Sequence, residues 1–223
     1  MPEDRRSGLD SGGCLNPACH AGGMTDTLSV DDDVVLFAAF PVVDDIVDPI
    51  DAFVFAQFYF DMENPDDFNH EIWDKSIAIN LTAPNYLIHE LKNKMNAGSS
   101  IVILTSTEGF RGSYGASAYA ATKAAIHNLV KTLANNLGKR GIRINALPAG
   151  WIGGEMDTDE IFNKSRSMTP LGRLGTDEEI ANVTCFLLSK ESSFVNGTTI
   201  VADGGYLCSD PLSKYEFEDT FGR

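Results

Sequence analysis

The chain has 223 residues, 43% of them hydrophobic, which is enough to bury one substantial core and predicts a single globular domain. Its formal net charge of −15 argues against binding to nucleic acid or to anionic lipid, because both need a positive surface. No apolar run approaches the length of a membrane span, and the four cysteines are too few and too scattered for a disulfide framework.

Residues 1–30 are rich in glycine, serine, proline and charge, and we predict that they form an irregular arm ahead of one domain over residues 31–223. No basic segment followed by an apolar one opens the chain, so we expect a cytoplasmic protein. Cys14, Cys19 and His20 have metal-ligating side chains, but no fourth ligand stands near them in the sequence. We therefore expect no metal site.

Two short apolar segments follow the arm. Residues 30–48 fit either a crossover helix, which Pro41 would interrupt, or a strand over Val34–Phe40, and we prefer the strand. Ile50–Phe58 is predicted as a buried strand, because it is a short run rich in apolar and aromatic residues. The polar stretch Glu63–Phe68 contains a proline and is expected to form a loop.

Apolar residues at helical spacing predict a helix over His70–Asn93, with a kink or bulge at Pro84. The same spacing places Asn80 in the middle of this helix, facing inward. A buried amide at such a position either satisfies loose backbone groups or takes part in chemistry, and the spacing alone leaves both open.

The next segment brings together three polar side chains of complementary chemistry. The β-branched run Ile101–Leu104 predicts a buried strand with Ser106 at its C-terminal end, and a helical pattern follows as far as Gly138. Tyr119 and Lys123 are four residues apart and share one face of that helix. A phenol has a pKa of about 10, which a neighbouring ammonium lowers. We therefore expect that Lys123 lowers the pKa of Tyr119, that Ser106 holds a substrate oxygen, and that the three side chains transfer a proton.

The remaining chain continues the alternation of strands and helices. Gly141–Ala146 is predicted as a strand, Trp151–Met168 as a variable, partly apolar loop that forms a pocket or lid, and Thr176–Ser189 as a structural helix that opens with a capping box. Thr198–Val201 is predicted as the last strand, followed after Tyr206 by an acidic, aromatic tail. This alternation predicts an α/β fold with a parallel sheet covered on both faces.

The run SAYAATKAA holds Tyr119 and Lys123, and Ser106 stands thirteen residues before the tyrosine. This set resembles the short-chain dehydrogenase/reductase family, and the similarity covers Pro49 to Tyr206. Three further motifs carry the resemblance: SIAINLTAP around Asn80, NALPAG from Asn145 to Gly150, and the turn Asp203-Gly204-Gly205.

The resemblance implies a doubly wound parallel sheet of the Rossmann type, a nicotinamide cofactor (NADH or NADPH), and a small-molecule carbonyl or alcohol as the substrate. It implies that Tyr119 gives or takes the alcohol proton and that Ser106 holds the carbonyl oxygen, while Asn80 supports a proton relay. The implied cofactor contacts are Tyr119, Lys123 and Gly150, with Lys123 on the nicotinamide ribose. Family members commonly pair subunits through the helices that hold the asparagine and the tyrosine, so a homo-oligomer is implied as well.

The sequence departs from the family pattern in the part that would hold the cofactor. No Gly-rich turn G-x-x-x-G-x-G follows a strand, and too few residues precede Asn80 for the family's first two βα units, so we expect the sheet to lack or replace them. Phe55–Phe58 stands where the family has N-N-A-G. Two alternatives stay open: a cofactor-independent acid–base enzyme (lyase, isomerase or dehalogenase-like) that uses the same site, and a catalytically silent subunit of this fold.

Overall fold

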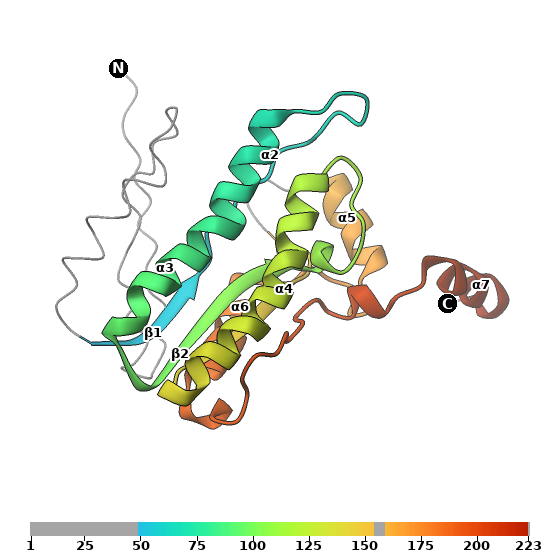
Figure 1. Ribbon diagram of the computed structural model, residues 1–223. Coiled ribbons are helices and arrows are strands. Elements are labelled where there is room, and N and C mark those ends of the chain that lie inside the picture. Colours follow the sequence, from blue (N-terminus) through green and yellow to red (C-terminus); the bar gives the residue numbers. More distant parts are fainter. Residues whose placement is uncertain (1–48, 154–158, 223) are drawn as a thin grey trace, which may run out of the picture.

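The structure is a computed structural model that describes residues 49–153 and 159–222. It is an α/β fold in which helices cover both faces of a parallel sheet (Figure 1). The predicted arm, segment 30–48 and the cysteine cluster lie outside the described residues. The place where a Gly-rich turn would stand also lies outside them.

Within the described residues, three parallel strands form the sheet, in the order in which they occur in the chain. They are β1 (Ile50–Phe55), β2 (Met95–Ser106) and β3 (Arg143–Ala149). Ser106 lies opposite Ala149, so β2 and β3 end together at one edge of the sheet. The predicted strands around Ile101–Leu104 and Gly141–Ala146 are confirmed, and the first is longer than expected.

The segment that follows residue 197 lies beside β3 without forming a continuous strand. The Ala146 amide donates a hydrogen bond to the Thr198 carbonyl over 2.9 Å, and the Ala202 amide donates to the Pro148 carbonyl over 2.9 Å. These bonds belong to two isolated parallel bridges. The segment predicted as a strand over Thr198–Val201 therefore lies beside β3 as a fourth, irregular strand that pairs only through isolated bridges.

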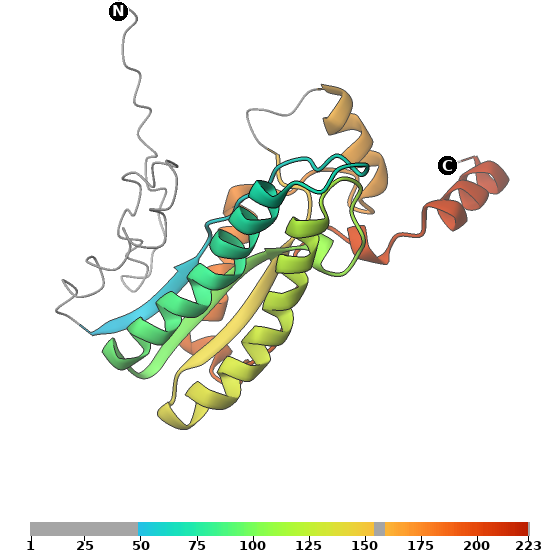
Figure 2. The ribbon, with the colours of Figure 1, turned by 45° about the horizontal axis from the view of Figure 1, so that its top comes forward.

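One face of the sheet is covered by a helical stretch over residues 70–94 and by the long helix α4 (Ser117–Leu137), which run side by side in both ribbon views (Figures 1 and 2). The stretch consists of α2 (His70–Ser76), a π-helical turn η1 (Ile77–Thr82), α3 (Ala83–Leu91) and a 3-10 turn η2 (Lys92–Lys94). The predicted helix is confirmed, and so is the bulge. Pro84 has no amide hydrogen to donate to the carbonyl of Asn80, which favours the wider π turn before it.

The other face is covered by α6 (Asp177–Leu188). Its predicted capping box is confirmed, because the Thr176 hydroxyl accepts from the Glu179 amide over 3.2 Å and the Glu179 carboxylate accepts from the Thr176 amide over 3.0 Å. The segment predicted as a variable loop instead contains a helix, α5 (Asp159–Met168). The tail forms α7 (Pro211–Phe221), which extends away from the sheet in both ribbon views.

Short 3-10 turns complete the described elements: η3 (Thr107–Gly109), η4 (Gly138–Arg140), η5 (Lys190–Ser192) and η6 (Tyr206–Cys208). Gly141 follows η4 with a φ of 75°, a conformation that glycine adopts without steric cost, and turns the chain from α4 into β3. In the described part of the chain, no helix is both long enough and apolar enough to cross a membrane.

Successive residues of β2 point to opposite faces of the sheet, which creates two cores. Ile101 and Ile103 pack with buried residues of α3 and α4, and Val102 packs with Leu187 of α6. Because the middle of β2 is covered on both faces, Ile101–Leu104 is a continuous apolar run rather than an alternating one. This rigid central strand carries Ser106 at its end.

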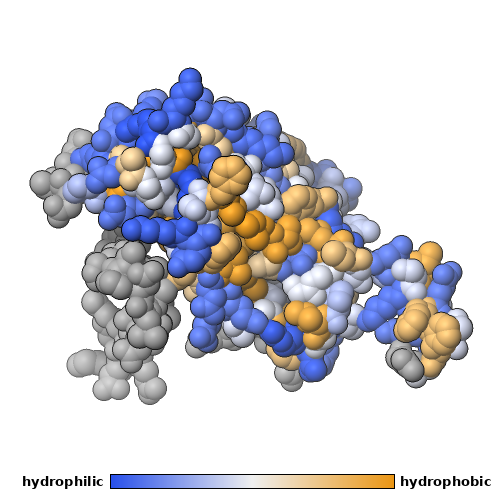
Figure 3. All heavy atoms as spheres, turned by 90° about the horizontal axis from the view of Figure 1, so that it is seen from below, coloured by the Kyte–Doolittle hydropathy of each residue, from blue (hydrophilic) through white to orange (hydrophobic). Residues whose placement is uncertain are grey.

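The prediction of a buried strand over Ile50–Phe58 is only partly right. β1 ends at Phe55, which is also its one buried residue, and Val54 is 38% exposed because β1 is an edge strand within the described residues. Seen from below, hydrophobic residues gather in a band across the molecule (Figure 3). Large exposed apolar side chains also occur on and after α6, at Phe186 and Phe194.

Candidate active site

The predicted site residues meet where β2 ends and α4 begins. Ser106 is the last residue of β2, and Tyr119 and Lys123 lie one turn apart in the first half of α4, as predicted. This place is the carboxyl end of the parallel strands, where open α/β sheets bind ligands. The loop between Ser106 and α4 runs through η3 and brings the two elements together.

Tyr119 is partly buried at this edge. Burial raises the pKa of Tyr119 to about 12; the Ser106 side chain acts against this shift, and the negative charge of Glu108 adds to it. The phenol therefore carries its proton at neutral pH. The expectation of a lowered pKa is wrong for this structure, because burial raises the pKa and Lys123 is not among the groups that shift it.

Lys123 is buried, with 4% of its surface exposed. Its Nζ donates to the Leu104 carbonyl over 3.4 Å and lies 5.4 Å from the centre of the Tyr119 ring. In the part of the chain that the structure describes, no carboxylate forms an ion pair with it. Burial lowers its pKa to about 8, so Lys123 is a cation near neutral pH that is held close to the point of losing its charge.

Asn80 lies in the π turn with 1% of its surface exposed, and its side chain bonds in three directions. Its Oδ1 accepts from the Tyr59 amide over 2.7 Å, and its Nδ2 donates to the Tyr59 carbonyl over 2.9 Å and to the Thr122 hydroxyl over 3.1 Å. The side chain thus pairs with both backbone groups of Tyr59, as a neighbouring strand would, and links Tyr59 to α4 through Thr122. The sequence left open whether this buried amide satisfies backbone groups or takes part in chemistry. The bonds show that it satisfies the backbone groups of Tyr59.

Two aromatic side chains after β1 pack on the site. Phe60 meets Tyr119 edge-on with ring centroids 5.3 Å apart, and Phe58 does so at 6.3 Å. The Phe58 ring also lies 5.8 Å from the Nζ of Lys123. The sequence places Phe58 in the turn that lines the cofactor in similar proteins, but only the structure shows that its ring reaches both reactive side chains.

The start of α4 is held by Glu63, which the sequence analysis assigned only to a loop. Its Oε1 accepts from the Ala118 amide over 2.7 Å, its Oε2 accepts from the Ser117 hydroxyl, and its own amide donates to the Gly115 carbonyl over 2.8 Å. A carboxylate at a helix N-terminus also complements the helix dipole. Glu63 therefore fixes the first turn of α4, from which Tyr119 projects.

Gly150 directly follows β3, and its amide donates to the Ala202 carbonyl over 3.0 Å. A Cβ at this position would lie 2.7 Å from the Cα of Asp203, so only glycine allows the two segments to come this close. The Asp203 carboxylate in turn accepts from the Gly205 and Leu207 amides, each over 2.8 Å. The two motifs that resemble the family, Asn145 to Gly150 and Asp203-Gly204-Gly205, therefore lie in direct contact.

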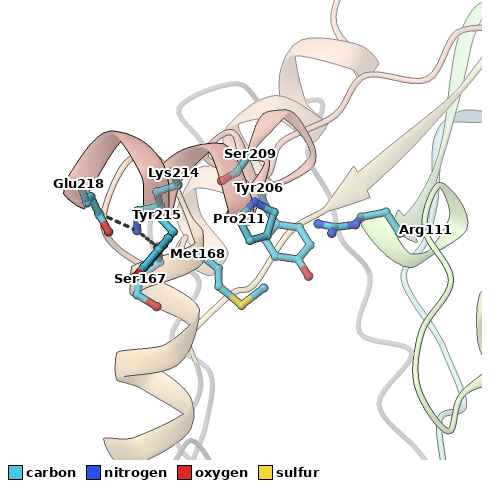
Figure 4. A pocket seen from close by; sticks show the side chains of 9 residues that line it. All are labelled: Arg111, Ser167, Met168, Tyr206, Ser209, Pro211, Lys214, Tyr215 and Glu218. Carbon is cyan, nitrogen blue, oxygen red and sulfur yellow. Dashed lines mark hydrogen bonds and ion pairs between the residues drawn. The ribbon is translucent and has the colours of Figure 1, made fainter. Parts of the chain in front are cut away.

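A cavity of about 250 Å³ lies between the loop that leads into α4 and the C-terminal elements (Figure 4). Arg111 approaches it from the loop and lies over the Tyr206 ring, 4.9 Å from its centre. The predicted loop Trp151–Met168 contributes Ser167 and Met168 at the end of α5, and α7 contributes Lys214. Among the described residues, no group of three or more His, Cys, Asp or Glu side chains is arranged to hold a metal ion.

Residues 22–207 match the sequence model of a family described as enoyl-(acyl carrier protein) reductase. The chain is 35% identical over 138 residues to a 3-oxoacyl-(acyl-carrier-protein) reductase of Aquifex aeolicus, in an alignment that covers 60% of this chain and 56% of that protein. It is 34% identical over 139 residues to a (3R)-3-hydroxyacyl-CoA dehydrogenase of Homo sapiens, covering 60% and 53%. The chain therefore spans little more than half the length of these relatives.

Solved structures share the fold. A short chain dehydrogenase family protein from Francisella tularensis superimposes with a TM-score of 0.72 at 28% identity, covering 76% of each chain. A gluconate 5-dehydrogenase from Burkholderia cenocepacia, in complex with NADP and tartrate, superimposes with a TM-score of 0.71 at 27% identity, covering 78% of this chain and 71% of that one.

Proposed function

Because the chain belongs to the short-chain dehydrogenase/reductase family, we propose that it is an NAD(P)-dependent oxidoreductase that interconverts a carbonyl group and an alcohol. The observation that carries the proposal is the placement of Ser106 at the end of β2, of Tyr119 in the first turn of α4, and of the buried ammonium of Lys123 one helical turn behind the tyrosine. These three side chains are the proposed proton-transfer site.

Tyr119 is the proposed proton donor to the substrate oxygen. Its pKa of about 12 keeps the phenol protonated at neutral pH, as a general acid must be. Ser106, whose side chain also acts on that phenol, is proposed to hold the same oxygen. As the proton leaves, negative charge develops on the phenolate, and the buried cation of Lys123 stabilises this charge more strongly than it would in water.

Lys123 also fits the nicotinamide end of the proposed cofactor. An ammonium has three donors, and its hydrogen bond within the described part of the chain is a long one, 3.4 Å to Leu104. The remaining donors suit the hydroxyls of a ribose. When bound, the nicotinamide supplies or accepts a hydride. The sequence contains no Gly-rich turn of the family type to receive the pyrophosphate, so that end of the cofactor has no assigned partner in this chain.

Asn80 is proposed to support the proton relay through its backbone carbonyl rather than through its amide. The amide is already committed to Tyr59 and Thr122. The carbonyl has lost its usual donor four residues later, because Pro84 has no amide hydrogen. A carbonyl in a π turn beside Lys123's helix can therefore bind a water molecule of the relay.

One observation favours a second candidate function, acid–base chemistry without a dinucleotide. Phe58 lies 5.8 Å from the Nζ of Lys123 and packs on Tyr119, in the turn where similar proteins line the cofactor. If that ring keeps its place, the same tyrosine serves an elimination or isomerisation. We place this candidate second, because the ring is 62% exposed and can be displaced by a ligand.

We also propose that the protein forms a homo-oligomer and acts on a small-molecule substrate. Support for oligomerisation comes from the hydrophobic band of Figure 3 and from large apolar side chains such as Phe186 and Phe194, which a second subunit would cover. Support for a small-molecule substrate comes from the family, because none of Ser106, Tyr119 and Lys123 lines the cavity beside Arg111. Light scattering measures the molar mass in solution and tests the assembly. The unaltered protein should have a multiple of the mass of one chain, and Phe194→Ser should weaken the association.

Titration of the purified protein with NADH and with NADPH, followed by nucleotide fluorescence, tests the main proposal. Binding in the micromolar range, together with carbonyl reduction that is lost in Tyr119→Phe, is the expected result. If neither nucleotide binds but a Tyr119-dependent elimination or isomerisation is found, the second candidate replaces the first. If neither binding nor turnover is detected, both functions are refuted.

A further inference from the structure

Glu108 contains a buried carboxylate oxygen that lacks a partner. Its Oε2 is out of contact with solvent and forms no hydrogen bond within the described residues. Leaving such an oxygen unpaired is costly, and native structures contain few such atoms. A donor from a water molecule, an ion or a bound ligand would satisfy this oxygen.

Glu108 belongs to the site by position. It lies in η3, two residues after Ser106, and its amide donates to the Ser106 hydroxyl over 3.2 Å. Its negative charge also contributes to the raised pKa of Tyr119. Glu108 and the Ser106 hydroxyl thus belong to one turn at the end of β2.

The turn that carries Glu108 is fixed against α4. A Cβ at Gly109 would lie 2.7 Å from Cε1 of His127 and 3.0 Å from the backbone of Lys123, so the turn contacts the helix directly. The Phe110 ring stacks on His127 with centroids 4.4 Å apart, and Nε2 of His127 is hydrogen-bonded to the Thr105 hydroxyl over 2.9 Å. The backbone that carries Glu108 is therefore fixed against α4.

We propose that Glu108 binds substrate directly, its Oε2 accepting a hydrogen bond from a hydroxyl on a carbon next to the reacting one. The substrate class is then vicinal diols and the corresponding α-hydroxy carbonyl compounds, in preference to simple alcohols and ketones. This inference rests on the proposed function, because it concerns the molecule that Ser106 and Tyr119 hold. It adds a residue that determines specificity to the proton-transfer site.

Two probes that differ only in the second hydroxyl test the proposal: cis-1,2-cyclohexanediol and cyclohexanol. Their kcat/KM values are measured with NAD⁺ and NADP⁺ for the unaltered protein, Glu108→Leu, Glu108→Gln, and Glu178→Gln on the exposed surface of α6 as a control for lost charge. The diol is expected to be preferred. Glu108→Leu should lower its kcat/KM by about 10- to 100-fold and change that of cyclohexanol by less than about 3-fold. Glu108→Gln, which keeps an acceptor oxygen and the side-chain shape, should retain part of the preference.

Binding of the same probes, measured by saturation-transfer NMR, separates this inference from the proposed function. Diol binding that is lost in Glu108→Leu, in a protein that turns over neither probe, supports the inference and counts against the oxidoreductase. Turnover of both probes without a preference for the diol, or equal losses on both in Glu108→Leu, overturns the inference and leaves the oxidoreductase standing. Failure to bind the diol more tightly than cyclohexanol also overturns it. Thermal unfolding of both Glu108 variants shows that each is folded.

Discussion

The Nζ of Lys123 lies 5.4 Å from the centre of the Tyr119 ring, yet burial moves the pKa values of the two groups in opposite directions. The phenol keeps its proton up to about pH 12, whereas the ammonium begins to lose its own near pH 8. Each shift favours the uncharged form, as expected for groups removed from water. The charge that develops on Tyr119 during proton transfer therefore depends on Lys123 remaining protonated.

The rate of carbonyl reduction should follow the protonation of Lys123. We expect kcat/KM to be level below about pH 8 and to fall above it, because the cation disappears while the Tyr119 proton is still present. A pH–rate profile of the reductive reaction, taken between pH 6 and 10, measures this. A profile that is level over the whole range would contradict the role given to Lys123.

Replacing Tyr119 by phenylalanine should remove the proton donor and leave the fold intact. We expect activity to fall by about 10²- to 10⁴-fold, the usual contribution of a general acid. Tyr114→Phe is a matched control, since this tyrosine precedes α4 and is 98% exposed. Initial rates of both variants measure the loss of activity, and thermal unfolding shows that both are folded. Equal rates in the two would mean that Tyr119 takes no part in the chemistry.

Replacing Lys123 by methionine should abolish activity and stabilise the fold at neutral pH. Burial lowers its pKa from 10.5 to about 8, so keeping the charge inside the folded protein costs on the order of 3 kcal/mol. Between pH 8 and 10.5 the unfolded chain holds this proton and the folded one does not, so the unaltered protein gains stability as pH rises. The advantage of Lys123→Met in chemical denaturation should therefore be largest below pH 8 and shrink towards pH 10.5.

The exposed Lys131 on the same helix is the control for that experiment. Lys131→Met should change the free energy of unfolding by less than about 0.5 kcal/mol, as is usual at the surface. If Lys123→Met is no more stable than the unaltered protein at pH 7, the ammonium of Lys123 has a partner that offsets its burial.

Replacing Asn80 by alanine should destabilise the protein by about 2–3 kcal/mol, because the amide and the carbonyl of Tyr59 would both lose their partner. Asn85→Ala, one turn further along at an exposed position, should cost far less. Urea denaturation measures both. A similar cost for the two variants would show that the bonds between Asn80 and Tyr59 contribute little to stability.

The triad of Ser106, Tyr119 and Lys123 could be predicted from the sequence because its geometry is local. An apolar run fixes where β2 ends, and a spacing of four residues on a helix fixes which side chains share a face. The helix bulge could be predicted for the same reason, since Pro84 cannot donate a hydrogen bond wherever the chain goes.

The rest of the site depends on contacts between distant residues. Glu63 and Ala118 are 55 positions apart, and Asn80 and Tyr59 are 21 apart, so no periodicity relates them. The direction of the shift in the Tyr119 pKa was predicted wrongly because spacing shows the nearby charge but not the loss of water around the phenol. The orphan oxygen of Glu108 likewise becomes visible only when the side chains around it are in place.

The π turn Ile77–Thr82 takes up one extra residue in this helical stretch, because its hydrogen bonds span five residues instead of four, as from the Ala83 amide to the Ala78 carbonyl. Removing one residue from the turn and returning to α-helical winding would therefore leave α2 with Ile72 and Ser76 still on its buried side. The same deletion inside α4 would rotate everything on one side of it by about 100°, the angle between successive residues of an α-helix. A deletion of one codon should therefore be better tolerated in the π turn than in α4.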